Sequence, residues 1–261
     1  MNILAIDFSS KLASAAVFSG GCCVASVTSE TLVWKGLESG ESDEKPTKLA
    51  GASALLTPLV HATIEQSGLK TSDFQLVALP VGPGLFTGLR VAAVTAKTFA
   101  YATGADLIGL NTLEVLAAKA HAANSSHAGL IRVAVNAQRQ QLFAGQYRST
   151  GDWQVESIGD NQIVDHQAWV ESWAAGDLIS GAGLRLVQPK LDASGLDNSS
   201  KRGFQIADQV DWDCDAESVA QMAKKHYENG RRDDLWNLKP LYFRPSAAEE
   251  NRMARHSPRN K

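Results

Sequence analysis

Residues 3–28 of the chain read ILAIDFSSKLASAAVFSGGCCVASVT. Three apolar runs lie in this stretch, at 3–7, 13–18 and 22–28, and a Gly20-Gly21 pair separates the last two. A double glycine between two short apolar runs is typical of a hairpin turn. The sequence therefore predicts a three-stranded meander at the start of the chain, with its first strand ending in an acidic residue.

Helices and strands alternate after the meander. The hydrophobic periodicity predicts a helix at residues 49–66, a strand at 76–81, a helix at 87–103 and a strand at 107–110. One face of the second helix would permit close approach of another helix, because it carries the small residues Ala92, Ala93, Ala96 and Ala100.

A weaker copy of this order begins near residue 131. A helix at 112–123 leads into it, and the further predicted elements are strands at 131–135 and 142–147, a helix at 165–173, a strand at 177–180, a helix at 216–228 and a last strand at 238–244. Strand meanders that feed crossover helices on a mixed sheet are typical of the ribonuclease-H-like half of actin-type ATPases. We therefore predict an α/β protein with a two-lobed actin-like ATPase (ribonuclease-H-like) fold and a degraded second lobe.

The two predicted lobes divide the chain near residue 128. Residues 1–127 would form the first lobe, which we expect to bind a partner, and residues 128–245 a second, smaller lobe. From residue 252 to 261 there are three arginines, one lysine and no acid. We expect residues 246–261 to form a basic, flexible tail.

Composition and charge limit the class of protein. The 261 residues carry a formal net charge of −3, so we expect no binding to nucleic acid by the chain alone. Of the three cysteines, Cys22 and Cys23 are adjacent, which is neither a disulfide framework nor a zinc spacing. The amino terminus lacks the features of a secretory signal, and no apolar run approaches the ~20 residues of a membrane span. These features predict a cytoplasmic protein without membrane association.

The strongest local motif is GPGLFTGLR at residues 82–90, between a predicted strand and a predicted helix. A glycine-rich turn at such a place can direct backbone N–H groups at an anion. It lacks the Gly-Lys-Ser/Thr end of a P-loop, so no lysine would reach a phosphate. Tight backbone packing through Gly82, Gly84 and Gly88 explains the residues equally well, and we expect Gly84 to adopt a conformation that side chains resist.

With this motif the chain resembles the TsaB (YeaZ-like) family of tRNA threonylcarbamoyladenosine biosynthesis, whose hallmark is Gly-Pro-Gly-Ser-Phe-Thr-Gly-Leu-Arg. Only the serine differs, and it is Leu85 here. The resemblance extends to ILAID at 3–7, LLTP at 55–58, VNAQR at 135–139 and PLYFR at 240–244. It therefore covers nearly the whole chain.

The resemblance implies a two-lobed actin-like fold and a complex with the catalytic sibling TsaD, joined by TsaE in bacteria. In such complexes TsaD transfers the threonylcarbamoyl group to the adenosine beside the anticodon. We therefore expect the present chain to be a non-catalytic partner subunit without activity of its own. ATP and a metal ion are then expected on the partner, and tRNA contact only through the complex. A homodimer is an open alternative for the isolated chain.

The metal ligands of the sibling have no match here. The sibling holds its metal with a His-x-Glu-x-His sequence at a helix start, in which two imidazoles one turn apart face the same ion. The matching stretch has Thr112 and Leu116 at the ligand positions, and leucine cannot bind a metal. We therefore expect no metal site and no catalytic residue.

The phosphate-binding hairpins of the fold are also altered. These hairpins are of Asp-x-Gly type, in which glycine lets the backbone close on the phosphate oxygens. The matching residues are Asp7 with Ser9 in the first hairpin and Asn136 with Ala137 in the second, so both glycines are missing. We expect degenerate phosphate loops and no cofactor bound by the chain alone. The Gly181-Ala182-Gly183 turn is either a remnant of the adenosine loop or an ordinary strand-end turn.

The two helices of the first lobe, at 49–66 and 87–103, are expected to dock against their counterparts in the sibling as a helical bundle. The outer-face residues expected at the seam are Leu55, Leu59, Ala93 and Lys97. The alternative is that both helices only cover their own sheet. A rival function is an active enzyme of the same fold, either an ATP-dependent kinase or a metal-dependent glycoprotease, which requires a phosphate or metal site.

Overall fold

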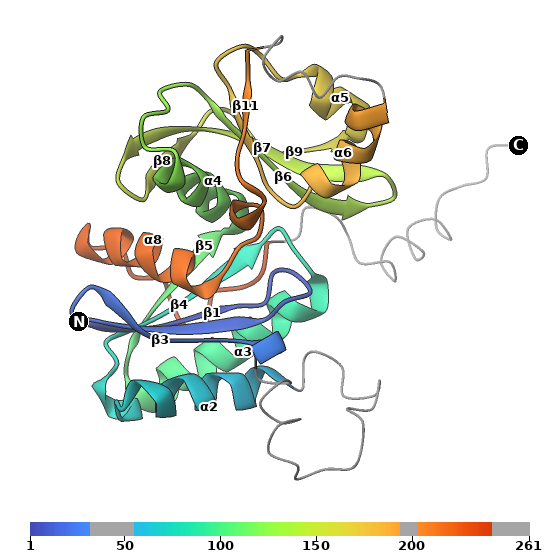
Figure 1. Ribbon diagram of the computed structural model, residues 1–261. Coiled ribbons are helices and arrows are strands. Elements are labelled where there is room, and N and C mark those ends of the chain that lie inside the picture. The colour runs from blue at the N-terminus through green and yellow to red at the C-terminus, as the bar shows by residue number, and fades with distance from the viewer. Residues whose placement is uncertain (32–54, 194–202, 242–261) are drawn as a thin grey trace, which may run out of the picture.

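The computed structural model describes residues 1–31, 55–193 and 203–241 (Figure 1). These residues form two lobes, each built on one β-sheet. The amino terminus lies in the lobe that is lower in Figure 1.

The first sheet has five strands in the order β3-β2-β1-β4-β5. Their bounds are Asn2–Asp7 (β1), Ser14–Ser19 (β2), Cys22–Thr28 (β3), Leu76–Gly82 (β4) and Asp106–Asn111 (β5). β1 is antiparallel to β2 and parallel to β4. The predicted meander is confirmed, and its first strand lies in the middle of the sheet.

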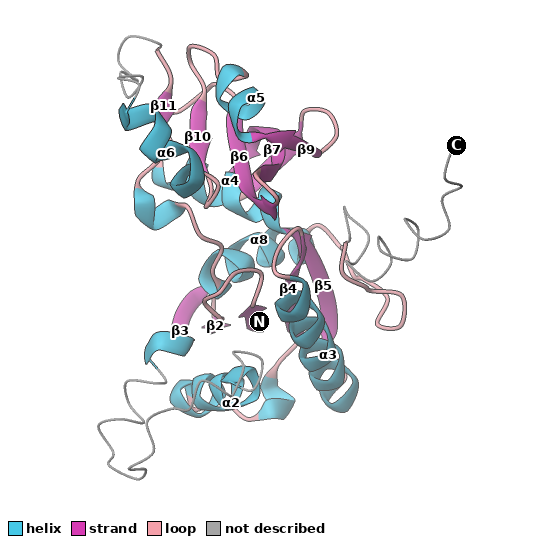
Figure 2. Cartoon of the chain, turned by 90° about the vertical axis from the view of Figure 1, so that its right-hand side faces the viewer, coloured by secondary structure: helices cyan, strands magenta, loops and turns pink. Residues whose placement is uncertain are grey.

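Among the described residues, four helices cover the first sheet: α2 (Leu56–Ser67), α3 (Phe86–Thr103), α4 (Thr112–Ala123) and α8 (Ala216–Glu228). Figures 1 and 2 show α2 and α3 together on one side of this sheet. Leu4 and Ile6 pack in the core on that side, whereas Ile3 and Ala5 pack in the core that contains α4 and α8. Successive side chains of a strand point to opposite faces, and both faces of this sheet are covered by helices. The sequence of β1 is therefore apolar from Ile3 to Ile6 and does not alternate with polar residues.

The second sheet repeats the plan of the first. Its strands follow the order β11-β10-β6-β7-β8, and β9 pairs with β7. The bounds are Ile131–Gln138 (β6), Gln141–Gly151 (β7), Gln154–Ser157 (β8), Gln162–Asp165 (β9), Leu178–Ser180 (β10) and Gln205–Ile206 (β11). β6 is antiparallel to β7 and parallel to β10. In the same way, β1 is antiparallel to β2 and parallel to β4. The second sheet has six strands, but its parallel side is the shorter one, because β10 has three residues and β11 two whereas β4 has seven and β5 six.

The remaining elements are short. Helices α5 (His166–Glu171) and α6 (Leu184–Ala193) pack on the second sheet, and 3-10 turns lie at Thr71–Asp73 and Gln209–Asp211. The core between the sheets joins both lobes, because α4 packs there with α8 and with β6. Although the division near residue 128 stays a prediction, α8 returns the chain to β1 and β2 of the first lobe.

Most predicted elements are confirmed, and the helix at 216–228 has the predicted bounds. Helix α2 begins at Leu56, and residues 49–54 of its predicted range lie outside the described residues, as does the tail predicted at 246–261. The strand predicted at 238–244 is wrong for residues 238–241, which only run beside the sheet; residues 242–244 lie outside the described part. Within the described ranges, no helix is long and apolar enough to cross a membrane.

Candidate functional site: the glycine turn and the outer face of α3

The glycine turn joins the end of β4 to the start of α3 and lies against the loop that follows β1. The peptide between Gly82 and Pro83 is cis, and Gly82 has a φ of 123°, a conformation that favours glycine. The backbone N–H of Leu85 donates to the carbonyl oxygen of Ser9 at 2.6 Å. The turn is therefore fixed to the first of the two predicted phosphate loops.

Two further glycines are required by this close approach. A Cβ atom at Gly84 would lie 2.5 Å from the Ser9 carbonyl oxygen, and one at Gly88 would overlap the Phe8 carbonyl oxygen. The expectation that Gly84 has an unusual backbone is wrong, because its φ is not positive and only space restricts it. Of the two explanations for the motif, tight packing is sufficient, because the backbone of Ser9 and Phe8 leaves no room for a side chain at Gly84 or Gly88.

Asp7 ends β1 and is fully buried. Its Oδ1 atom accepts a hydrogen bond from the Ser9 N–H at 2.9 Å, and its Oδ2 atom has no hydrogen-bond partner among the described residues. Burial raises the pKa of Asp7 to about 7, and the nearby charges of Asp213 and Asp215 act in the same direction. The first loop thus holds an acid that is largely shielded from solvent.

The second predicted phosphate loop is the hairpin between β6 and β7. The Asn136 Oδ1 atom accepts a hydrogen bond from the Gln138 N–H at 2.7 Å. Gln138, Arg139 and Gln140 all have positive φ values, between 53° and 66°, while Ala137 is buried. This loop closes on itself through the pairing of Gln138 with Gln141. That both loops are degenerate for nucleotide stays a prediction.

The Gly181-Ala182-Gly183 turn follows β10. Gly181 has a φ of 100°, and the Gly183 N–H donates to the Ala134 carbonyl oxygen at 2.8 Å. A Cβ atom at either glycine would press on Ala134 of β6. The ordinary strand-end turn is therefore sufficient to explain these glycines.

Thr112 and Leu116, at the positions of the sibling's metal ligands, are buried in the core between the sheets. Glu114 lies between them in sequence, and burial raises the pKa of its carboxyl, opposed by the nearby Arg231. In the part of the chain that the structure describes, no three His, Cys, Asp or Glu side chains form a group that could hold a metal ion.

The four expected seam residues do not share an outer face. Leu59 is fully buried and Ala93 is 5% exposed, and both pack in the core between α2, α3 and the first sheet. The expectation that they lie on outer helix faces is therefore wrong, because these small and apolar residues cover their own sheet. Leu55 is half-buried, and the Lys97 ammonium donates to the carbonyl oxygens of Trp236 and Leu238, at 3.2 and 3.1 Å.

The outer face of α3 instead presents other apolar side chains. Val94 is 66% exposed, Tyr101 70% and Trp236 72%. The rings of Tyr101 and Trp236 pack edge to face, with centroids 5.8 Å apart. Val94 and Tyr101 are two helical turns apart, so periodicity could have found them, whereas Trp236 reaches this face only through the chain that follows α8. We call Val94, Tyr101 and Trp236 the α3 stripe.

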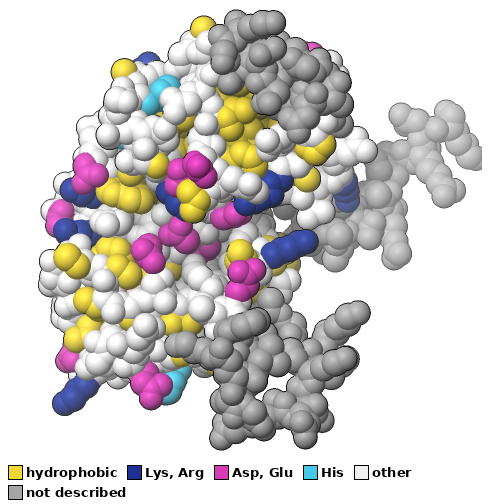
Figure 3. All heavy atoms as spheres, viewed as in Figure 1, with side chains coloured by type: hydrophobic (Ala, Val, Ile, Leu, Met, Phe, Trp, Pro, Cys, Tyr) yellow, Lys and Arg dark blue, Asp and Glu magenta, His cyan; other side chains and the backbone are white. Residues whose placement is uncertain are grey.

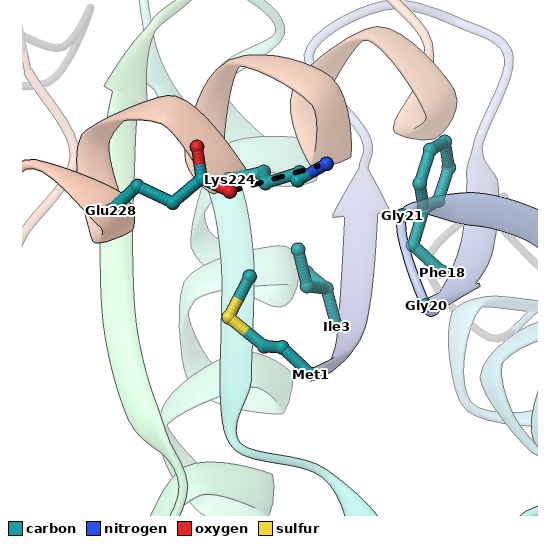
Figure 4. Close-up of a pocket in the computed structure, with 7 residues that line it drawn as sticks. All are labelled: Met1, Ile3, Phe18, Gly20, Gly21, Lys224 and Glu228. Carbon is teal, nitrogen blue, oxygen red and sulfur yellow. Dashed lines mark ion pairs between the residues drawn. The ribbon is translucent and has the colours of Figure 1, made fainter.

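A pocket of about 280 Å³ lies at the other end of β1 (Figure 4). It is lined by Met1, Ile3, Phe18, Gly20, Gly21, Lys224 and Glu228, and the Lys224 ammonium and the Glu228 carboxylate lie 4.0 Å apart at its edge. None of the residues singled out in the sequence as site candidates lies in it. The pocket is therefore separate from the glycine turn, which meets the opposite end of β1.

Sequence comparisons find relatives in one pathway. The family model described as tRNA N6-adenosine threonylcarbamoyltransferase, TsaD, matches residues 51–179. The tRNA threonylcarbamoyladenosine biosynthesis protein TsaB of Bacillus subtilis (strain 168) is 30% identical over 115 residues, which are 44% of this chain and 48% of that protein. A tRNA N6-adenosine threonylcarbamoyltransferase of Erythrobacter litoralis is 37% identical over 70 residues, 27% of this chain and 20% of that protein. The chain thus spans about half the length of the first relative and less of the second.

The solved structure of YeaZ from Pseudomonas aeruginosa has a similar fold. It superposes with a TM-score of 0.68 at 20% identity, over 93% of this chain and 99% of that one. The predicted fold class is confirmed: the chain has the two-lobed actin-like fold, with one ribonuclease-H-like sheet in each lobe.

Proposed function

Because this chain is a protein of the TsaB (YeaZ-like) family, we propose that it acts in the biosynthesis of threonylcarbamoyladenosine in tRNA. Its proposed role is that of a non-catalytic partner of a TsaD-type transferase. Support comes from the Bacillus subtilis relative, named as a protein of this biosynthesis, and from the transferase model that matches residues 51–179.

The α3 stripe is the observation that carries the proposed partner role. Val94 and Tyr101 expose apolar surface on one face of α3, and Trp236 adds a second aromatic ring that packs against Tyr101. Large aromatic side chains are enriched among the residues that dominate binding energy at protein interfaces. We therefore propose Val94, Tyr101 and Trp236 as the centre of the seam, in place of the buried Leu59 and Ala93.

The residues that match the transferase family model indicate which surface the partner would present. Helices α2 and α3 both lie within residues 51–179, so a transferase of that family is expected to present a related helix pair. Two related pairs can pack face to face as a four-helix arrangement, with apolar residues at the centre. Leu55 and Lys97, which are half-buried, would then lie toward the edge of the seam.

The division of labour is also a proposal. With Thr112 and Leu116 at the ligand positions, the metal ion and ATP would belong to the transferase, and a TsaE-like ATPase would be a further member of the complex. A net charge of −3 favours contact with tRNA only through the assembled complex. A homodimer of the isolated chain stays a prediction.

A charge on the α3 stripe tests the partner role. Val94→Glu places a carboxylate where docking would have to desolvate it, so we expect the affinity for the transferase of the same cell to fall about a hundredfold or more by calorimetry. Val210→Glu is the matched control, because Val210 is similarly exposed (72%, against 66% for Val94) but lies in the 3-10 turn Gln209–Asp211 between the lobes. Unchanged affinity of a folded Val94→Glu variant would remove the α3 stripe from the interface.

A further inference from the structure

Within the described residues, the chain passes between its two lobes twice. The first passage follows α4, from Asn124 to the start of β6. The second is the segment 207–215, which leaves β11 and enters α8. The second passage runs beside α4 in Figure 1. Any rotation of one lobe against the other must change the geometry of both passages.

Each end of the second passage is attached to a different sheet. On the side of the second sheet, the Ala207 N–H donates to Ile179 O at 2.9 Å, and the Ser180 hydroxyl donates to Asp211 O at 3.2 Å. On the side of the first sheet, the Ala216 N–H donates to the Ser14 hydroxyl oxygen at 2.9 Å. The segment between these attachments is the part that would bend if the lobes moved.

Lys119 of α4 holds the middle of this segment. Its ammonium donates to the carbonyl oxygens of Val210 and Asp213, at 2.9 and 3.0 Å, and to the carboxylate of Asp215 at 2.7 Å. A lysine has three N–H donors, and here each has an acceptor on the second passage. The side chain is 14% exposed, so water screens these contacts little.

Two other links strengthen the same region. The Gln205 side-chain amide donates to the Asn124 side-chain oxygen at 2.7 Å, which joins the ends of the two passages directly. Arg185 of α6 makes a two-pronged ion pair with Asp213, at 2.9 and 2.5 Å. Acidic side chains gather across the middle of the molecule between the lobes (Figure 3). The second passage carries four aspartates, Asp208, Asp211, Asp213 and Asp215. Lys119 and Arg185 supply the opposite charge that lets these acids lie together.

We propose that Lys119 clamps the second passage to α4 and so fixes the angle between the lobes. Together with the core between the sheets, which joins both lobes, this clamp opposes opening and closing of one lobe against the other. Rotation would pull the second passage away from α4 and leave at least one of three charge-assisted hydrogen bonds unmade. This inference goes beyond the proposed partner role and does not depend on it.

Hydrogen exchange on the full chain tests the clamp. In Lys119→Met, we expect the N–H groups of residues 207–215 to exchange at least tenfold faster, and small-angle scattering to show a larger radius of gyration. Lys225→Met is the matched control, because Lys225 also links the lobes, through an exposed ion pair with Asp152 at 3.4 Å. It removes the same charge and should change neither measurement. Unchanged exchange in a folded Lys119→Met variant overturns the proposal, as does an equal change in the control.

A chemical rescue separates the ammonium from general packing. Lys119→Ala should be loosened in the same way, and millimolar n-propylammonium, which replaces the missing part of the side chain, should restore slow exchange at 207–215. The uncharged 1-propanol should not, and equal rescue by both compounds contradicts the proposal. If Lys119→Met does not fold, hydrogen exchange of Lys119→Arg tests the clamp instead. It keeps the charge, but its planar donors cannot meet three acceptors around one point, so exchange as slow as in the unaltered chain would overturn the clamp.

Discussion

Asp7 and Asn136 make the same hydrogen bond at equivalent places in the two sheets. Each ends the apolar part of a central strand, and each accepts, through its Oδ1 atom, the N–H two residues further on, at 2.9 Å for Asp7 and 2.7 Å for Asn136. Both side chains therefore shape a turn in the same way. They differ in their surroundings, because Asp7 is fully buried and Asn136 is exposed.

Asp7→Asn is expected to stabilise the protein above neutral pH. The folded-state pKa of Asp7 is raised to about 7, so the folded state keeps a proton between pH 4 and 7 that the unfolded state releases. Stability therefore falls as pH rises through this window, by up to a few kcal/mol, and is constant above it. The variant lacks this loss, so its melting temperature should exceed that of the unaltered chain by about 5 °C at pH 8 and match it near pH 4.

The reverse change in the second loop is the control for this prediction. Asn136→Asp adds a carboxylate at an exposed position, so its stability should follow that of the unaltered chain across the same pH range. If Asp7→Asn shows no pH-dependent advantage in thermal melts, then Asp7 is ionised in the folded protein and its carboxylate is compensated.

Gly88→Ala should damage the glycine turn severely. The added methyl group would overlap the Phe8 carbonyl oxygen, which belongs to the backbone and cannot turn aside. Although alanine favours a helix by up to about 1 kcal/mol, we expect a net loss of several kcal/mol in urea unfolding. Gly68→Ala is the comparison, because its φ is 71° but its surroundings are open, so only about 1 kcal/mol of backbone strain is expected. Equal losses in the two variants would refute the close approach.

Leu85→Ser should stabilise helix α3. Leu85 is the N-cap residue, it has an extended backbone, and its side chain makes no capping hydrogen bond. A serine there can accept from an N–H of the first turn, which is typically worth about 1 kcal/mol. Leu85→Ala serves as the control that removes the leucine without adding an acceptor. Equal unfolding free energies of the two variants would show that the cap is not formed.

Ala93→Glu and Val94→Glu are expected to differ although the positions are adjacent. Ala93 packs in the core with α2 and the first sheet, so a carboxylate there should unfold the isolated chain or cost several kcal/mol. Val94 points outward, and its variant should melt within about 2 °C of the unaltered chain. If the Ala93→Glu variant is stable and binds the transferase more weakly, then Ala93 lies on the outer face of α3, as the sequence predicted.

Local sequence patterns predicted the elements well but not their outward faces. The helix Ala216–Glu228 has the bounds that its apolar period predicts, and the structure shows in addition that the Asp215 side chain caps its start. In α3 the hydrophobic period does not show which face is buried, because the small Ala93 and the larger Val94 and Tyr101 are all compatible with burial. Only packing against α2 and the first sheet shows which of them faces solvent.

Contacts between distant segments account for what the sequence could not predict. Trp236 meets Tyr101, and Lys119 meets the residues before α8, across separations of more than ninety residues. The short strands β8 and β9 were also missed, because they depend on pairing with β7 and not on a strong period of their own. The fold class needed only the order of elements, whereas the clamp and the α3 stripe needed the tertiary structure.

The return of α8 to the first sheet has a consequence for how the protein is made. During synthesis β1, β2 and β4 leave the ribosome early, but α8, which covers one of their faces, is completed only at Glu228. Apolar residues such as Ile3 and Phe18 therefore stay uncovered by α8 while the entire second lobe is synthesised. A nascent chain of this protein is thus expected to bind chaperones until α8 emerges, and a fragment that ends near residue 128 should stay insoluble.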